Sequence, residues 1–105
     1  MELQAINMMI LDNYKLIIEY HTGEIKFIDL KDIIFAHDCW EELRDETIFK
    51  QAFIDEFDDA PCWPNHNLDM DPIEVYFLGE TINKLTNDIT IKDLNNSLNN
   101  INIQK

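Results

Sequence analysis

The sequence predicts an α+β domain in which a three-stranded antiparallel meander and a β-hairpin form one sheet, with short helices packed on it. Apolar runs separated by short turns fill residues 3–29, which is typical of consecutive antiparallel strands. Apolar residues at helical spacing follow the meander and recur after residue 71. Only two glycines and three prolines interrupt the 105 residues, which favours long uninterrupted elements over many tight turns.

The meander is expected to occupy the first 29 residues. Its first strand lies in the apolar run of residues 3–11, and the second in residues 14–20, where apolar and polar side chains alternate. Residues 25–29 return as the third strand after a turn in which Gly23 can supply a positive φ. Lys26 lies between two apolar neighbours of this strand and is therefore expected to face solvent.

Two short helices are predicted after the meander. Residues 30–34 carry apolar side chains at helical spacing, and Asp29 is placed to cap this helix. Asp45 and Glu46 begin the second, which extends to Ala52, because acids in the first turn suit the helix dipole.

A second hairpin is predicted from residues 52–57 and 60–63, joined by a turn at Asp58 and Asp59. Aromatic side chains occur on both of these segments and would form its apolar face. Trp63, at the end of the returning strand, is accordingly expected in the core.

The last helix of the domain is expected to start at Asp71, the N-cap, with Pro72 at the first helical position. Gly79 is expected to end it. The side chains predicted to form its buried stripe are Ile73, Tyr76 and Phe77.

The sequence divides into a single domain, residues 1–80, and an Asn-rich C-terminal extension, residues 81–105. Seven of these twenty-five residues are Asn, a mediocre helix former. Apolar residues nevertheless recur at helical spacing in the extension, at Ile91, Leu94, Leu98 and Ile101. They predict a marginal amphipathic helix that needs a surface, either on its own domain or on a second copy in a homo-oligomer.

Charge is the strongest global signal in the composition. Eight basic and twenty-one acidic residues give a net charge of −13, and residues 37–80 alone carry thirteen acids and two bases. This block repels phosphates, which argues against nucleic acids and anionic membrane surfaces as partners. It favours a basic protein or a cation, although net charge alone also keeps a small protein soluble.

The sequence shows no membrane or export signal. No apolar run approaches the ~18 residues of a membrane-spanning helix, and the first residues lack the basic start of a signal peptide. Two cysteines do not form a disulfide framework. We therefore expect a cytoplasmic protein.

One set of residues forms a pattern, by order and spacing, that covers about three-quarters of the chain: Tyr14, Leu16, Gly23, Glu24, Asp29, Leu30, Ile33, Trp40, Leu43, Arg44, Asp45, Ile48, Phe49, Trp63, Asp69, Pro72 and Tyr76. This pattern resembles that of domain-of-unknown-function family 2442, a family of small bacterial proteins. The loop from Trp63 to Asp69 is one residue longer than is common in the family, with His66 where Gly is usual.

The resemblance implies an α+β fold and no enzyme activity. It also implies a partner, because family members look like companions of a second small protein, domain-of-unknown-function family 4160. That arrangement is similar to toxin–antitoxin pairs.

A metal site is one alternative that the residues leave open. His37, Cys39, Cys62 and His66 are side chains that zinc accepts, but neither half has the two-residue cysteine spacing of common zinc modules. The plainer interpretation is a buried cysteine that packs as a small hydrophobe, together with a surface histidine. We therefore predict no metal and no cofactor, and keep these four residues as the alternative ligand set.

Catalytic patterns are missing from the sequence. Asp69 and Asp71 resemble a carboxylate pair, yet a calcium loop needs a turn glycine that this region lacks, and both residues suit loop and N-cap roles. No nucleophile motif surrounds the cysteines, and two glycines cannot build a phosphate-binding loop. The expectation is a protein without enzyme activity.

The best candidate surface is an aromatic side chain among acids. Trp40 is followed by Glu41, Glu42 and Asp45, and further candidates for contact are Asp58, Asp59 and His66. Such a surface could dock a basic partner, unless Trp40 turns into the core. The resulting hypothesis is an uncharacterised interaction domain, an acidic antitoxin-like partner of a small basic protein. The alternative is a small metal- or ligand-binding protein.

Overall fold

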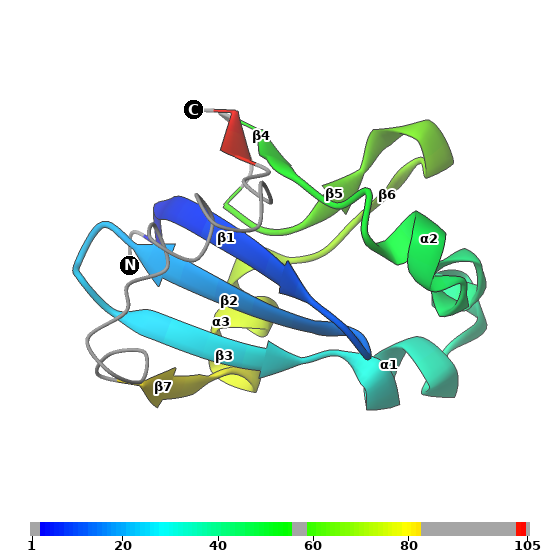
Figure 1. Ribbon diagram of the computed structural model, residues 1–105, viewed down its shortest axis with the longest axis horizontal. Coiled ribbons are helices and arrows are strands. Elements are labelled where there is room, and N and C mark those ends of the chain that lie inside the picture. Colours follow the sequence, from blue (N-terminus) through cyan, green and yellow to red (C-terminus); the bar gives the residue numbers. More distant parts are fainter. Residues whose placement is uncertain (1–2, 56–58, 83–102, 105) are drawn as a thin grey trace.

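A four-stranded antiparallel sheet forms the centre of the molecule and confirms the predicted α+β class (Figure 1). The computed structural model describes residues 3–55, 59–82 and 103–104. The strand order is β1-β2-β3-β7, with β1 (Ala5–Leu11), β2 (Lys15–Tyr20), β3 (Ile25–Asp29) and β7 (Glu80–Ile82). The predicted meander is therefore β1-β2-β3, and β7 adds a fourth strand that continues past the expected domain boundary at residue 80.

Short helices follow the meander and lie beyond one end of the sheet (Figure 1). They are α1 (Lys31–Ala36), the 3-10 helix η1 (Asp38–Arg44) and α2 (Glu46–Phe49). Asp29 accepts a hydrogen bond from the Lys31 backbone at 3.0 Å, but the N-cap of α1 is Leu30, so Asp29 is not the cap that was predicted. Asp45 caps α2 by accepting from the Thr47 backbone at 2.9 Å.

The hairpin forms, but between other segments than those predicted. Strand β5 (Cys62–Trp63) pairs antiparallel with β6 (Leu68–Asp69) across the 3-10 helix η2 (Pro64–His66). Asn67 takes the left-handed conformation, with φ of 57°, and this turns the chain back onto Trp63. The two segments predicted to pair are joined by a bridge between Phe53 and Cys62, while β4 (Ile54–Asp55) pairs in parallel with β8 (Ile103–Gln104).

The core lies between one face of the sheet and the helices. Trp63 is 1% exposed, as expected, and its Nε1 donates to the Phe49 carbonyl at 3.0 Å. The opposite face of the sheet carries a second, smaller cluster, whose members are Met9, Ile17 and Ile25 with Leu11, Phe27 and Ile82 packed against them.

The prediction that Lys26 faces solvent is wrong, because this residue is only 8% exposed. Ile25 and Phe27 belong to the second cluster, so the alternation of β3 places Lys26 on the main-core face beside Ile28. There its Nζ lies 4.2 Å above the Tyr76 ring and 3.8 Å from Glu24 Oε2. An ion pair and a cation–π contact thus replace the water that the amino group loses.

Helix α3 (Pro72–Leu78) starts and ends as predicted, at the Asp71 cap and at Gly79. Of the predicted buried stripe, Tyr76 packs against the core as expected, but Ile73 and Phe77 are 53% and 68% exposed, and Val75 is fully buried instead. The close approach of the helix end to β3 sets this rotation. A Cβ added at Gly79 would lie 2.9 Å from an Ile28 side-chain carbon, so only glycine lets the helix end so close to the sheet.

Among the described helices, none is both long and apolar enough to span a membrane.

Candidate functional site

A hollow of about 250 Å³ opens between α1, η1 and α3. Its walls are mainly apolar, and two carboxylates from the start of α3 lie among them; the lining residues are Ile33, Trp40, Met70, Val75, Leu78, Asp71 and Glu74. Met70 and Val75 are buried, whereas Trp40 is half-buried and Leu78 is exposed. The hollow is therefore an apolar site with an open mouth. We name it the α3 groove.

Exposed apolar side chains extend from the α3 groove along the outer face of α3. Ile73, Phe77 and Leu78 are large hydrophobic residues that remain exposed, and all three belong to this one seven-residue helix. The Phe77 ring packs edge-on against Tyr76, with ring centroids 5.2 Å apart. Scattered apolar residues are normal on protein surfaces, but a contiguous group beside a hollow marks an interaction site.

Several acids at and beside the α3 groove belong to no ion pair in the described part of the chain. Elsewhere in that part, ion pairs join Asp12 to Lys50, Asp38 to Arg44, Glu24 to Lys26 and Glu42 to His66. Within residues 3–55 and 59–82, none of these pairs includes Glu74 of the groove, nor the exposed Asp32 and Glu41, which adjoin Ile33 and Trp40 in sequence. Their charges are not locally compensated, which makes the potential over the groove negative.

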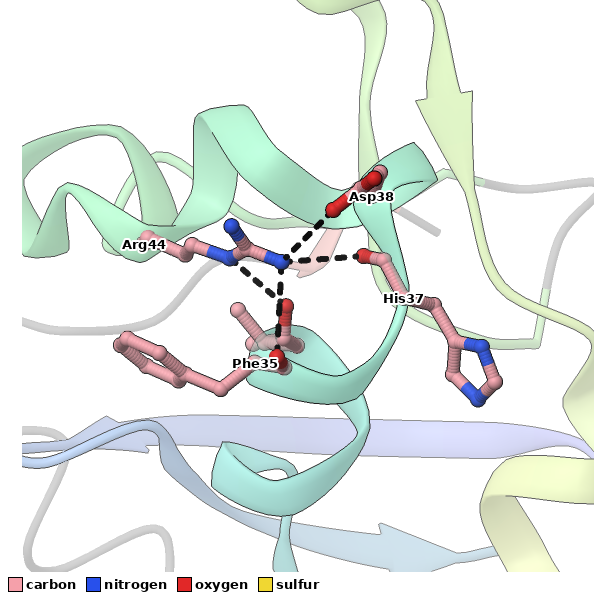
Figure 2. Close-up of polar contacts among 5 residues, drawn as sticks. Phe35, His37, Asp38 and Arg44 are labelled. Atoms are coloured by element: carbon pink, nitrogen blue, oxygen red, sulfur yellow. Dashed lines mark hydrogen bonds and ion pairs between the residues drawn. The ribbon is translucent and has the colours of Figure 1, made fainter.

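Arg44 fixes the wall of the α3 groove formed by α1 and η1. Figure 2 shows its guanidinium directed at the end of α1, where Nε donates to the Ile34 carbonyl at 3.1 Å. Nη2 lies 3.5 Å from the Phe35 and His37 carbonyls. The Phe35 carbonyl lies in the last turn of α1, where intrahelical donors end, and the His37 carbonyl also accepts from the Trp40 backbone at 3.1 Å. The guanidinium carbon also lies 5.6 Å from the Phe35 ring centroid.

Tyr14 secures the same junction from the sheet side. Its hydroxyl donates to the Arg44 carbonyl, and its ring packs edge-on against Phe35 and Phe49 at 5.3 and 5.5 Å. Tyr14 and Asn13 both have positive φ in the β1–β2 turn, a conformation that a tyrosine rarely adopts. The buried ring and its hydrogen bond hold Tyr14 there.

Two of the predicted interaction residues lie at or beside the α3 groove, and four others have structural contacts. Trp40 lines the groove and Glu41 is exposed next to it. Glu42 pairs with Nδ1 of His66, linking η1 to the β5–β6 turn. Asp45 caps α2, Asp59 accepts from the Ala5 backbone at 3.2 Å, and Asp58 lies outside the described residues.

The alternative ligand set does not come together. Cys62 is buried with Sγ 3.2 Å from the Phe53 carbonyl, and His66 is engaged by Glu42. His37 and Cys39 are exposed at the start of η1. Across the described ranges, no three His, Cys, Asp or Glu side chains are grouped so that they could hold a metal ion.

The carboxylate pair also separates into different roles. Asp71 accepts from the Ile73 and Glu74 backbones at 2.8 and 3.2 Å, as an N-cap does. Asp69 is exposed on β6, where its backbone pairs with Cys62.

A polar cluster that the sequence analysis missed ties α3 to the sheet. Tyr76 donates its hydroxyl to Glu24 Oε1, and Thr81 Oγ1 donates to Glu24 Oε2 at 2.9 Å. These two hydrogen bonds, the one from Tyr76 first, lower the pKa of Glu24, and the nearby Lys26 ammonium lowers it further. These contacts span more than fifty residues of sequence, so no local pattern signals them.

Comparison with known proteins gives one match. Neither curated proteins nor solved structures include a match to this chain. A family described as "Protein of unknown function (DUF2442)" matches residues 5–81, which include β1 through α3 and the whole α3 groove. The match covers well over half of the chain, and the protein therefore belongs to the DUF2442 family.

Proposed function

We propose that this protein is a non-enzymatic interaction domain that binds a small basic protein, as an antitoxin binds its toxin in the bacterial cytoplasm. The observation that carries the proposal is the α3 groove, an apolar hollow with Trp40 in its wall and uncompensated acids beside it. An aromatic anchor in a partly desolvated pocket is the usual centre of a protein interface. The acids would steer a basic partner and exclude acidic ones.

The size of the α3 groove supports a protein ligand over a metabolite. Its enclosed space of about 30 Å³ is far smaller than the roughly 300–1,000 Å³ of typical small-molecule sites. Its chemistry points the same way, since the lining includes no histidine, cysteine or hydroxyl side chain to serve as base or nucleophile. Of its two carboxylates, Asp71 is already engaged as a helix cap.

The decisive experiment is co-expression with the protein encoded beside its gene, followed by affinity measurement at about 0.05 M and about 0.5 M salt. We expect a complex at low salt that weakens at high salt, because screening reduces the attraction between unlike charges. In cells, the neighbour alone should inhibit growth, and co-expression should restore it.

Two charge-reversal variants provide a matched control. Glu74→Lys changes an acid of the α3 groove, whereas Glu80→Lys changes an exposed acid of β7 that is not among the groove residues. Both shift the net charge equally, so only a local effect makes the first weaken the complex more. Failure of the neighbour to bind at low salt, or binding indifferent to salt, would refute the proposal.

A further inference from the structure

The exposed face of α3 has the geometry of a helix-packing surface. Ile73 and Phe77 are four residues apart, as are Glu74 and Leu78, so the helix presents two neighbouring rows at i, i+4 spacing. Such rows are the ridges that interdigitate when two α-helices pack. One row is apolar, and the other combines a carboxylate with an apolar residue that also lines the α3 groove.

The volume of the groove limits what such a helix can insert. The enclosed space is about 30 Å³ and the rest is open to solvent, so the groove admits the end of one side chain but not several side chains. The walls around this space are Trp40, Leu78 and Ile33, all apolar, with buried Met70 and Val75 below. An aliphatic side chain suits these apolar walls, whereas a basic group would find its partner at the Glu74 carboxylate on the rim.

Charge complementarity decides which kind of helix fits. A second copy of this chain would bring another net charge of −13 against the same acids, so repulsion disfavours self-association here. Glu74 lies on the rim of the groove and, within the described residues, belongs to no ion pair. A Lys or Arg on the incoming helix, one turn from the anchoring side chain, would reach this carboxylate.

We infer that the α3 groove receives an amphipathic basic helix of the partner protein. One Leu, Ile or Met of that helix enters between Trp40 and Leu78, its neighbouring apolar residues cover Ile73 and Phe77, and a Lys or Arg pairs with Glu74. This inference rests on the proposed function and specifies the structural element of the partner that is recognised.

The probe is a fluorescein-labelled, alanine-rich helical peptide with Leu at positions i and i+4 and Lys at i+1 and i+8. Its affinity for the full chain is measured by fluorescence polarisation. Changing the two Leu to Ser should weaken binding about tenfold or more, because it removes the anchor. Changing the two Lys to Glu should weaken it by a similar factor, and more strongly at low salt.

Protein variants locate the bound peptide. Leu78→Ser is expected to reduce affinity about tenfold, whereas Ile6→Ser, which alters an equally exposed apolar residue on β1, should leave it unchanged. Phe77→Ser is a second groove-side variant, and its 68% exposure means that the fold tolerates it. Equal binding by the Leu78 and Ile6 variants, or no peptide binding, would overturn the inference.

Parallel measurements separate this inference from the proposed function. If the neighbouring protein forms a salt-sensitive complex that Leu78→Ser and Phe77→Ser leave unchanged, the helix inference is wrong and the proposed function stands. If neither the neighbour nor the peptide binds, both are wrong. Sedimentation of the full chain adds a third outcome. If the chain forms a dimer that Leu78→Ser dissociates, the groove binds a second copy, and the basic-helix inference is wrong.

Discussion

At the scale of single residues, Arg44 shows how one side chain connects elements that lack a hydrophobic core of their own. Helix α1 and the 3-10 helix η1 are short, and each buries few side chains, Ile34 and Leu43 respectively. Helices of this length are unstable in isolation. The guanidinium contacts three carbonyls near the junction, and the Arg44 carbonyl accepts from Tyr14. The positions of Ile33 and Trp40 in the α3 groove therefore depend on Arg44.

Arg44→Lys tests this role while keeping the positive charge. A lysine ammonium cannot reproduce the planar fork that spans the Ile34, Phe35 and His37 carbonyls, so we expect a loss of about 1–2 kcal/mol in the free energy of unfolding. Urea denaturation measures the difference. Lys31→Gln removes a charge from the exposed side of α1 and should change stability by less than about 0.5 kcal/mol. A loss for Arg44→Lys no larger than that for Lys31→Gln would show that Arg44 acts only as a surface cation.

At the scale of elements, Glu24 joins the β2–β3 hairpin to both α3 and β7. Its two oxygens accept from Tyr76 of α3 and from Thr81 of β7. Because these hydrogen bonds favour the charged carboxylate, the folded state lowers the pKa of Glu24 below its usual value near 4.5. A lowered pKa in the folded state means that the contribution to stability is complete above about pH 4.5 and disappears as pH falls through the folded-state pKa.

Tyr76→Phe should weaken this acid dependence, since it removes the largest cause of the pKa shift and keeps most of the ring. The measurement is the difference in urea midpoint between wild type and variant at pH 7 and again near pH 3. We expect a deficit for Tyr76→Phe at pH 7 that shrinks at the lower pH, because protonation of Glu24 removes the charged acceptor of the tyrosine hydroxyl. Comparing the two proteins at each pH cancels the change in overall charge. A deficit that stays constant with pH would mean that the hydroxyl does not act through Glu24.

The elements differ in how far the sequence predicts them, and the reason is the range of the contacts that fix each one. Asp71-Pro72 and Gly23 act within one turn of chain, and the predicted helix start and hairpin turn are both confirmed. The rotation of α3 is set by the approach of Gly79 to β3, which lies some fifty residues earlier in the chain. For that reason periodicity alone led to Ile73 and Phe77 as buried residues.

The candidate site shows the same division. Trp40 and its acidic neighbours are visible as a local pattern, and the structure places Trp40 in the α3 groove. The opposite wall, Glu74 and Leu78, depends on the rotation of α3 and could not be predicted from the sequence. The burial of Lys26 could not be predicted either, because it depends on contact with the Tyr76 ring of α3, which is distant in the sequence.

At the scale of the whole molecule, the net charge of −13 acts on folding and on binding in opposite directions. Inside one molecule, like charges repel and destabilise the compact state. Between this molecule and a basic partner, the same charges attract. The pairs Asp12–Lys50 and Asp38–Arg44 offset little of the repulsion, since ion pairs between exposed side chains contribute only about 0–1 kcal/mol each.

Salt should therefore raise the stability of the free protein while it weakens the complex. Raising sodium chloride from about 0.02 M to about 0.5 M shortens the Debye length from about 20 Å to about 4 Å, so the repulsion among the acids is largely screened. The urea midpoint of the free protein should increase over this range, and urea suits the test because it adds no ions of its own.

The Glu74→Lys and Glu80→Lys variants are each two charges less negative than wild type. Because repulsion within the molecule depends on total charge, the urea midpoint of both variants should increase less with salt than that of wild type, and by the same amount in each. Only binding should distinguish them, with Glu74→Lys the weaker. A urea midpoint that falls with salt would show that attractive ion pairs outweigh the repulsion. The acids would then stabilise the folded state.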